Sequence, residues 1–266
     1  MKEYKLGFIG CGHMGFAIAK GIKDKGLLDS NNIYIYDINT NIQNKCSNEG
    51  FIISEDLESL CNKSEIVLLA TTPQHTEPIL EEIKAYEVDN ILSIVTGLST
   101  THIKEYLPNT FVVRAMPNTP LQVGCGATVL CTSDNNHEDI YEYIKNLLSA
   151  IGLVEEIPEE QFPLLVSAHG STPAYFYYFV ECILEDLKER GMDEKVARRL
   201  LVETLIGSGE LLKADEEKPL SEFVNAVCSK GGTTIQAITH FRENGLKDLV
   251  KEANEKCINR AKEFEK

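Results

Sequence analysis

The sequence predicts a doubly wound α/β domain followed by an all-helical domain, and two observations support this fold class. Short apolar runs alternate with helix-like stretches through the first part of the chain. After Pro158 the strand-like runs stop, and large apolar residues recur at helical spacing instead. The chain has 266 residues, enough for two modest domains, and we place them at residues 1–158 and 159–266.

The predicted strands of the first domain include continuous apolar runs, which are typical of parallel strands covered on both faces. We expect strands over residues 5–10, 33–37, 65–70, 90–95, 110–114, 126–131 and 152–157. We expect helices between them, among others over residues 75–86, 99–106 and 137–149. This alternation indicates a doubly wound sheet.

The second domain is expected to contain helices over residues 173–190, 193–214, 232–243 and 245–264, with a polar break at 215–219. Asp193 is placed to cap the second helix, and Thr172 before Pro173 has the pattern of a cap followed by a first-turn proline. Several helices are apolar on more than one face, so they need partners on several sides. Packing between the two domains of a monomer would supply them, but we favour a homodimer.

Composition excludes several classes of function. The formal net charge is −15, which argues against nucleic acid and anionic membranes as partners. The sequence contains no run of 18 apolar residues, so we expect no membrane-spanning helix. No signal-type segment follows Met1, and we therefore expect a cytoplasmic protein. The eight cysteines form no C-x-x-C pair or zinc-type cluster. We therefore expect no metal site, and cysteines that are mostly buried and reduced.

A glycine-rich turn carries the strongest functional signal. Residues 10–15 (Gly-Cys-Gly-His-Met-Gly) follow the first predicted strand and open a helix-like stretch. Three glycines can be a turn only, but this context is the one that a dinucleotide-binding fingerprint requires. The helix N-terminus then holds a pyrophosphate, which the backbone can approach because glycine has no side chain. We expect the cofactor to bind at Gly10, Gly12, His13, Met14 and Gly15.

Asp37 completes the fingerprint at the end of the second predicted strand. Its carboxylate would accept hydrogen bonds from the adenosine ribose hydroxyls and would repel a 2′-phosphate. No lysine or arginine follows before Lys45, which favours NADH. Asn39 and Thr40 can bind a phosphate, so NADPH stays open.

Two further segments are candidate ligand sites. Residues 113–120 follow a strand at the edge of the sheet where ligands bind, although a rigid structural turn would explain their prolines. Within this segment Arg114 is either an anion ligand or a structural ion-pair partner. Residues 228–234 place two glycines and two threonines before a helix, a pattern that forms either an anion cradle of carboxylate size or a plain cap.

Four motifs occur in order along the chain: G-x-G-x-M-G at 10–15, R-A-M-P-N-T-P at 114–120, G-S-x-P-A-Y at 170–175 and G-G-T-T at 231–234. In these motifs the chain resembles the pyrroline-5-carboxylate reductases, from Leu6 to about Phe264. The resemblance implies a Rossmann domain followed by a helical dimerisation domain, in homodimers that some members assemble into rings. It also implies reduction of 1-pyrroline-5-carboxylate, a cyclic imine, to L-proline with NADH or NADPH, the last step of proline biosynthesis.

The resemblance also implies the residues of the site. We expect the hydroxyl of Thr234 to hydrogen-bond to the imine nitrogen, which makes it the candidate catalytic residue. The substrate would be held by Ser171, Ser229, Gly231, Gly232, Thr233 and Thr234. Besides the glycine turn, the cofactor would be lined by Ala70, Thr71, Thr72, Pro73, Met116, Pro117 and Asn118.

The chain departs from the family pattern at four places. His169 and Thr172 replace a serine and the residue before proline, and Lys230 replaces a proline. Asn225 stands where aspartate is usual, and Ala-Thr-Thr-Pro at 70–73 where Ala-Val-Lys-Pro is usual. These departures leave open a different cyclic imine as substrate, or a dinucleotide-binding regulator that keeps the fold.

A 2-hydroxyacid-type dehydrogenase is a further alternative. Enzymes of that shape usually carry a catalytic lysine on the first long helix of the second domain. Here the helix that starts at Pro173 has no lysine before Lys188, which weighs against this class.

Overall fold

The computed structural model describes residues 4–134 and 136–265. The chain divides into two compact units. The first contains the described residues up to Pro173 together with those from Cys257 onward, and the second is Ala174–Lys256. The predicted division into domains at residue 158 stays a prediction.

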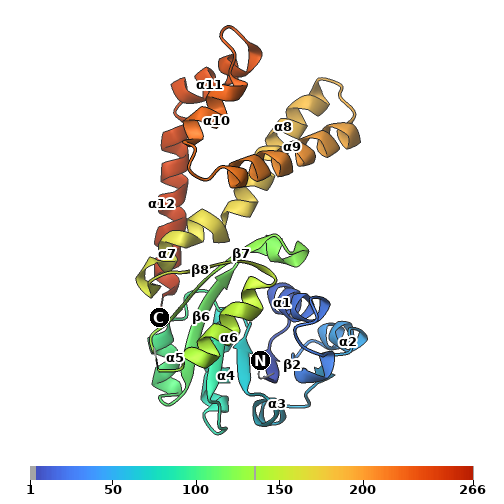
Figure 1. The fold of residues 1–266 in the computed structure, drawn as a ribbon, viewed down its shortest axis with the longest axis vertical. Helices are drawn as coiled ribbons and strands as arrows, with labels where there is room; N and C mark the ends of the chain where they lie inside the picture. Colours follow the sequence, from blue (N-terminus) through green and yellow to red (C-terminus); the bar gives the residue numbers. More distant parts are fainter. Residues whose placement is uncertain (1–3, 135, 266) are drawn as a thin grey trace. The chain divides into compact units, whose positions relative to one another are not determined.

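The first unit is built on one eight-stranded sheet with the order β3-β2-β1-β4-β5-β6-β7-β8 (Figure 1). All neighbouring strands are parallel except β6 and β7, which are antiparallel. The strands are β1 (Leu6–Ile9), β2 (Ile33–Tyr36), β3 (Ile52–Ile53), β4 (Ile66–Leu69), β5 (Asn90–Ser93), β6 (Phe111–Pro117), β7 (Gly126–Thr132) and β8 (Gly152–Glu156). The chain order reverses its direction at β1, so the crevice at the ends of β1 and β4 is the expected ligand site.

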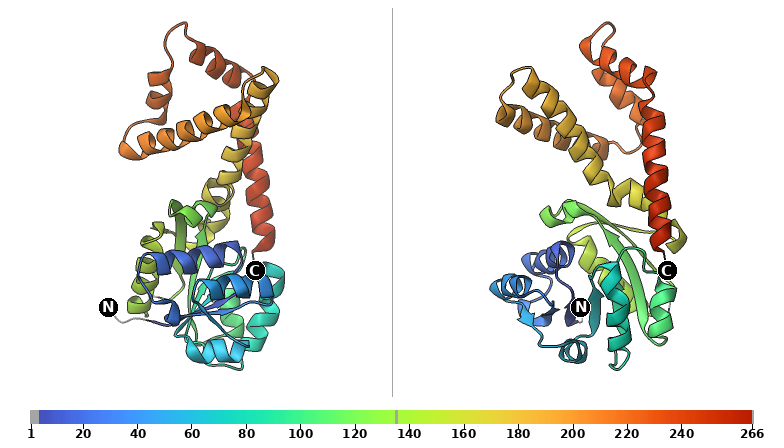
Figure 2. Two further views of the ribbon diagram at one scale, coloured as in Figure 1. Left: turned by 90° about the vertical axis from the view of Figure 1, so that its right-hand side faces the viewer. Right: turned by 180° about the vertical axis from the view of Figure 1, so that it is seen from behind.

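Helices cover both faces of the sheet (Figures 1 and 2). They are α1 (His13–Asp24), α2 (Thr40–Asn48), α3 (Leu57–Lys63), α4 (Pro73–Ile83), α5 (Thr100–Tyr106) and α6 (Glu138–Ser149). Strand side chains alternate between two cores, because successive residues of a strand point to opposite faces. In β4, for example, Leu68 packs into the core with Ile18 of α1, and Leu69 into the core with Leu80 of α4.

The α/β prediction is confirmed, and the predicted strands occur in the predicted order with ends that shift by a few residues. β6 extends to Pro117, three residues beyond its predicted end, because its last residues pair with β7. The sequence analysis did not place β3, α2 or α3. These elements are short, and β3 has only two residues, so they carry little periodic signal.

The second unit is all-helical. It contains most of α8 (Thr172–Glu189) and α12 (Leu246–Phe264), together with α9 (Glu194–Ala214), α10 (Leu220–Val227) and α11 (Thr233–Glu243). The carboxylate of Asp193 accepts a hydrogen bond from the Val196 N–H at 2.9 Å, so its predicted capping role is confirmed. α10 was not predicted. Among the described residues, no helix is both long and apolar enough to cross a membrane.

The start of α8 differs from the prediction. A helix α7 (Phe162–Leu165) continues directly into a π-helical stretch, η4 (Val166–Gly170), and then into α8. The Ser171 N–H donates to the Val166 carbonyl at 2.7 Å, five residues back. Thr172 therefore caps no helix N-terminus; its hydroxyl donates to the Ser167 carbonyl at 2.6 Å instead. The predicted helix over residues 173–190 is confirmed as α8, but the predicted cap at Thr172 is wrong because the preceding turns are already helical.

Candidate active site

The glycine turn has the geometry of an anion site. Gly10 has φ +83°, and a Cβ placed on it would lie 2.9 Å from the Ala70 carbonyl oxygen, so only glycine fits. Gly12 precedes α1, and no side chain caps this helix. The first N–H groups of α1 therefore have no side-chain cap. The space beside Gly12 is open, since a Cβ on this residue would meet nothing within 4 Å. Free donors and the helix dipole together favour a phosphate there.

Asp37 lies beside this turn. Its carboxylate accepts a hydrogen bond from the Cys11 N–H at 2.8 Å and another from the Asn39 N–H at 2.9 Å. The carboxylate thus joins the end of β2 to the phosphate turn, and it keeps lone pairs for a further donor. A cavity of about 200 Å³ opens here. It is lined by Ile9, Gly10, Gly12, Tyr36, Asp37, Ile38, Ala70, Thr71, Thr72, His75 and Ile79.

This cavity brings together residues that are far apart in the sequence. The candidate cofactor residues Gly10, Asp37 and Thr72 all line it. The sequence analysis missed His75 and Ile79, which come from the first turns of α4. Their four-residue spacing places them on one face of that helix, which is the signal that could have found them. His75 is held by the Thr72 hydroxyl, 2.9 Å from its Nδ1.

Met116, Pro117 and Asn118 lie at the end of β6, on the same edge of the sheet as the glycine turn, because β1 and β4 to β6 are parallel. The Asn118 side chain is a structural bridge. Its Oδ1 accepts from the Ala127 N–H at 2.8 Å, and its Nδ2 donates to the His169 carbonyl at 3.3 Å. Asn118 thereby links the end of β6 to β7 and to the π-helical stretch.

Arg114 is a structural ion-pair residue, which decides between the two alternatives for it. Its guanidinium is 4% exposed and contacts Glu159 at 3.0 Å and Glu265 at 2.7 Å. Glu159 also accepts hydrogen bonds from the N–H and the hydroxyl of Thr100, at 2.8 and 2.6 Å. Burial alone would lower the pKa of Arg114, but the two carboxylates raise it above its usual range. With both acids bound, Arg114 is not placed to act as a ligand for an anion.

Ser171 and His169 lie at the π-helical stretch. The Ser171 hydroxyl is 3.4 Å from the Cys257 thiol. Both ring nitrogens of His169 are shielded from solvent and have no hydrogen-bond partner, and burial lowers the pKa of its imidazole. A π-turn inside a helix is uncommon and often marks a functional position.

The second predicted anion cradle lies in the helical unit. Gly231 has φ +73°, and the Gly232 N–H donates to the Ser229 carbonyl at 3.0 Å, which closes a tight turn before α11. No side chain caps α11, so the first N–H groups of this 11-residue helix are free, as they are in α1. Thr233 and Thr234 form its first turn. This arrangement suits a carboxylate.

Comparison with known proteins agrees with this geometry. Residues 159–264 match the family model for pyrroline-5-carboxylate reductase dimerisation, and residues 5–97 match that for NADP oxidoreductase, coenzyme F420-dependent. The chain is 30% identical to a pyrroline-5-carboxylate reductase of Haemophilus influenzae over 100% of its own length and 99% of the relative's. It is 31% identical to one from Aquifex aeolicus, over 96% and 94%. The chain belongs to the pyrroline-5-carboxylate reductase family.

Solved structures extend the comparison. A Plasmodium falciparum pyrroline carboxylate reductase with NADP bound matches with a TM-score of 0.91 at 26% identity, over 100% of both chains. A Coxiella burnetii pyrroline-5-carboxylate reductase matches with a TM-score of 0.89 at 28% identity, also over both whole chains. The predictions of the family and of a Rossmann domain followed by a helical dimerisation domain are thus confirmed.

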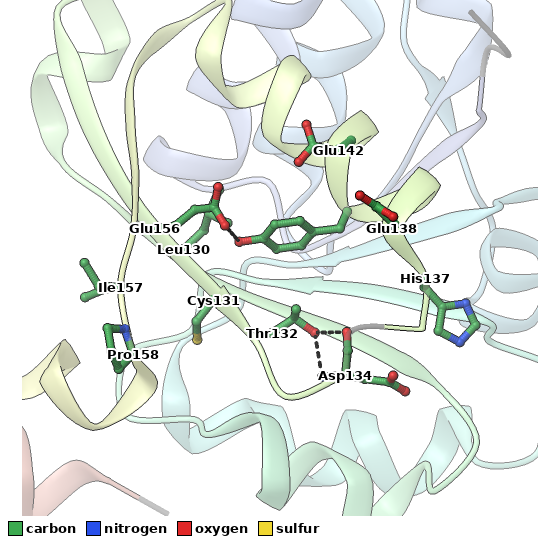
Figure 3. A pocket seen from close by; sticks show the side chains of 11 residues that line it. Leu130, Cys131, Thr132, Asp134, His137, Glu138, Glu142, Glu156, Ile157 and Pro158 are labelled. Atoms are coloured by element: carbon green, nitrogen blue, oxygen red, sulfur yellow. Dashed lines mark hydrogen bonds between the residues drawn. The ribbon is translucent and has the colours of Figure 1, made fainter.

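A second cavity, larger than the one at Asp37, lies elsewhere on the sheet. It measures about 550 Å³ and is lined by the ends of β7 and β8 and by α6 (Figure 3). Because β7 runs antiparallel to β6, Thr132 pairs with Val113, so the cavity lies near the far end of β6 from Met116. Four carboxylates line it, those of Asp134, Glu138, Glu142 and Glu156. They would repel an anionic dinucleotide.

The cysteines are all free, but the expectation that most are buried holds for only half. Cys11, Cys46, Cys61 and Cys131 are buried, whereas Cys125 and Cys182 are exposed. A hydrogen bond to Cys46, together with burial, raises the pKa of the Cys11 thiol above its usual range. Burial and the raised pKa of Cys11 both disfavour the thiolate, which is the form of cysteine that acts as a nucleophile.

Proposed function

We propose that this protein reduces 1-pyrroline-5-carboxylate to L-proline with NADH or NADPH, as the last step of proline biosynthesis. The observation that carries the proposal is a pair of uncapped helix starts, at Gly12 and at Gly232, in a chain that matches this family over its whole length. One helix start suits a pyrophosphate and the other suits a carboxylate. A cofactor and an imino acid present these two groups.

The residues divide the work of binding. The free N–H groups at the start of α1 hold the pyrophosphate, and Asp37 accepts hydrogen bonds from the adenosine ribose. The backbone at Gly231–Gly232 and the start of α11 grip the substrate carboxylate. Ser171, Ser229 and Thr233 supply further polar contacts to the substrate. Ala70, Thr71, Pro73 and Pro117 complete the wall along the cofactor.

Catalysis then depends on position and on one hydrogen bond. A reduced nicotinamide supplies the hydride when it is bound. Fixing the imine carbon beside the donor removes the entropic cost of bringing the two together, which is a large part of the barrier. The hydroxyl of Thr234 hydrogen-bonds to the imine nitrogen. This hydrogen bond stabilises the nitrogen in the transition state, while its charge changes as the C=N bond is reduced to an amine. The hydride adds to the imine carbon and the ring nitrogen takes up one proton from water, which gives the secondary amine.

NADH is the cofactor that the site favours. Asp37 places a carboxylate where the 2′-phosphate of NADPH would lie. The nearest following cation, Lys45, does not line the Asp37 cavity; its ammonium stands 3.4 Å from the centroid of the Phe16 ring. Asn39 and Thr40 are exposed and offer a weaker alternative for a phosphate.

The chain acts as a homodimer in this proposal, through the region that matches the dimerisation model. Rings of dimers are a further possible assembly. The substrate is a small cyclic imine carboxylate, and the cytoplasm is the compartment that suits eight free cysteines.

The test is oxidation of NADH, followed at 340 nm, on addition of 1-pyrroline-5-carboxylate. We expect rapid oxidation by the wild-type protein, with a higher kcat/KM for NADH than for NADPH. Thr234→Val should lower kcat/KM by about 100-fold without changing the thermal unfolding midpoint, because a transition-state hydrogen bond is lost. Thr234→Ser, which keeps the hydroxyl, should retain most of the activity.

Other outcomes contradict the proposal. No oxidation with 1-pyrroline-5-carboxylate, but oxidation with another cyclic imine, would assign a different substrate. No oxidation with any imine, together with tight NADH binding, would indicate a regulator. Wild-type kinetics in Thr234→Val would remove Thr234 from the mechanism.

A further inference from the structure

The polar side chain of His169 has no hydrogen-bond partner among the residues that the structure describes. A neutral imidazole carries one N–H donor and one acceptor nitrogen. In this structure neither nitrogen finds a hydrogen bond, and both are shielded from water. A buried polar group without a hydrogen bond lowers the stability of the folded protein by about 1–3 kcal/mol, so two such nitrogens in one ring need an explanation.

The neighbours of His169 do satisfy one another. The Thr172 hydroxyl donates to the Ser167 carbonyl at 2.6 Å, and the Ser171 hydroxyl contacts the Cys257 thiol at 3.4 Å. The His169 carbonyl accepts from Asn118 at 3.3 Å. The main chain of His169 is thus fixed while its ring is left without a partner. In the orientation of this structure the shielded nitrogens do not reach a ligand. The residue as a whole is only half-buried, and a half-turn of the ring about χ2, which exchanges its nitrogens with its carbons, is the step that would present them.

The main chain of His169 is held at one particular end of the sheet edge that carries the dinucleotide site. In the sheet, β2 and Asp37 lie on one side of β1, while β4, β5 and β6 lie on the other. A dinucleotide with its ribose at Asp37 and its pyrophosphate at α1 extends its nicotinamide toward the ends of β4 to β6. The main chain of His169 lies there, because Asn118, which directly follows β6, donates to its carbonyl, and a Cβ on Gly170 would lie 3.8 Å from the Met116 sulfur.

Several polar groups of the two ligands have no assigned partner, and the carboxamide of the nicotinamide is one of them. The proposed function, on which this inference rests, gives the pyrophosphate to α1, the ribose to Asp37, and the carboxylate and imine nitrogen to residues 231–234. The carboxamide offers one acceptor oxygen and one donor NH₂ group. A neutral imidazole matches it with one donor and one acceptor.

We propose that His169 binds the nicotinamide carboxamide and so fixes which face of the nicotinamide ring meets the substrate. Burial keeps the imidazole neutral by lowering its pKa, so it can both donate and accept. Rotation of the carboxamide is restricted by this contact, and the thioether of Met116 lies close to the same turn. His169 is therefore a cofactor-binding residue in this chain. The family pattern usually has serine at this position, so the pattern alone does not predict this role.

The test compares two ligands on the full-length protein by isothermal titration calorimetry. ADP-ribose has the adenosine, both phosphates and both riboses of NADH, but no nicotinamide. We expect His169→Ser to raise the Kd for NADH by about 5- to 10-fold, the equivalent of one hydrogen bond of about 1 kcal/mol. The Kd for ADP-ribose should not change.

Two further variants make the result interpretable. His75→Ser is the matched control, because His75 lines the cavity at Asp37, and it should leave the ratio of the two Kd values at its wild-type value. His169→Asn, whose amide also donates and accepts, should recover part of the NADH affinity. If His169→Ser fails to fold, the same comparison of NADH with ADP-ribose is made on His169→Asn.

Unchanged NADH affinity in His169→Ser, or an equal loss for NADH and ADP-ribose, would overturn the inference. Neither result depends on turnover. A wild-type protein that fails to reduce 1-pyrroline-5-carboxylate would instead overturn the proposed function and leave the binding comparison intact.

Discussion

Two glycines of the phosphate turn, Gly12 and Gly15, differ in whether the fold requires them. A Cβ on Gly15 would lie 2.9 Å from the Gly10 carbonyl oxygen and 3.1 Å from the Ala70 side chain, so this glycine is needed for packing of α1 on the strands. A Cβ on Gly12 would meet nothing within 4 Å. Packing therefore does not require glycine at position 12, and we infer that its lack of a side chain serves the ligand.

We predict opposite effects for alanine at these two positions. Gly12→Ala should change the free energy of unfolding by less than about 1 kcal/mol, but raise the Kd for NADH by about 10-fold or more. Gly15→Ala should lower the free energy of unfolding by about 1–3 kcal/mol through overpacking. Urea titration and calorimetry measure the two quantities. NADH binding by Gly12→Ala at wild-type affinity would show that the pyrophosphate lies elsewhere.

At this scale the sequence predicts local features well and distant ones poorly. The turn at 10–15 and the acid at Asp37 follow from spacing along the chain, and the structure joins them through the Cys11 N–H. The partners of Arg114 are Glu159 and Glu265, 45 and 151 residues away, so no spacing rule finds them. The unpaired ring of His169 is likewise a product of tertiary packing and not of a motif.

At the scale of elements, a buried ionic cluster joins four segments of the first unit. Arg114 of β6 contacts Glu159 after β8 and Glu265 after α12, and Glu159 also holds Thr100 at the start of α5. The guanidinium lies 4.5 Å over the Phe162 ring. The cluster holds the middle of β6, two residues before Met116. It thereby connects the path of the chain after α12 to the cofactor edge of the sheet.

This cluster should respond non-additively to neutralisation. Glu159→Gln or Glu265→Gln alone leaves Arg114 one carboxylate and should lower the free energy of unfolding by about 1 kcal/mol. The double change leaves a buried charge without a counter-ion and should cost about 3–5 kcal/mol. A double-mutant cycle in urea measures the coupling.

A matched control for the cluster is Glu156→Gln, which breaks an exposed ion pair with Lys145 and should cost less than about 1 kcal/mol. Additive effects of Glu159→Gln and Glu265→Gln would show that water, and not the second acid, compensates Arg114.

Helices and strands differ in how well the sequence predicts them. The long apolar strands and the long helices of the second unit are found because many residues repeat their period. β3 has two residues and α10 eight, and both escape. The π-helical stretch was not predictable from a cap pattern, because Thr172–Pro173 fits a helix start locally while the upstream turns override it.

For the whole molecule, the second unit lacks a core of its own. Residues 174–256 are all described, and Ala197 is the only buried one among them. Large apolar side chains are exposed instead, including Phe176 at 52%, Tyr178 at 67% and Leu200 at 59%. An isolated helical unit of this kind would not repay its conformational entropy. The apolar faces predicted from sequence are thus present, and a second copy of the chain is the partner that the match to the dimerisation model supports.

We therefore predict that folding and dimerisation are coupled. Sedimentation equilibrium should give twice the chain mass of 29.7 kDa, and the thermal midpoint should rise with protein concentration because association stabilises the folded chain. Phe176→Glu or Leu200→Glu should shift the protein toward monomer and lower the midpoint, since each replaces about 1.5–3 kcal/mol of apolar burial with a desolvated charge. Ile38→Glu, on an 82% exposed residue of the first unit, should leave the mass unchanged. A monomeric wild-type protein whose midpoint is independent of concentration would contradict the prediction, because the helical unit would then have to be stable without a partner.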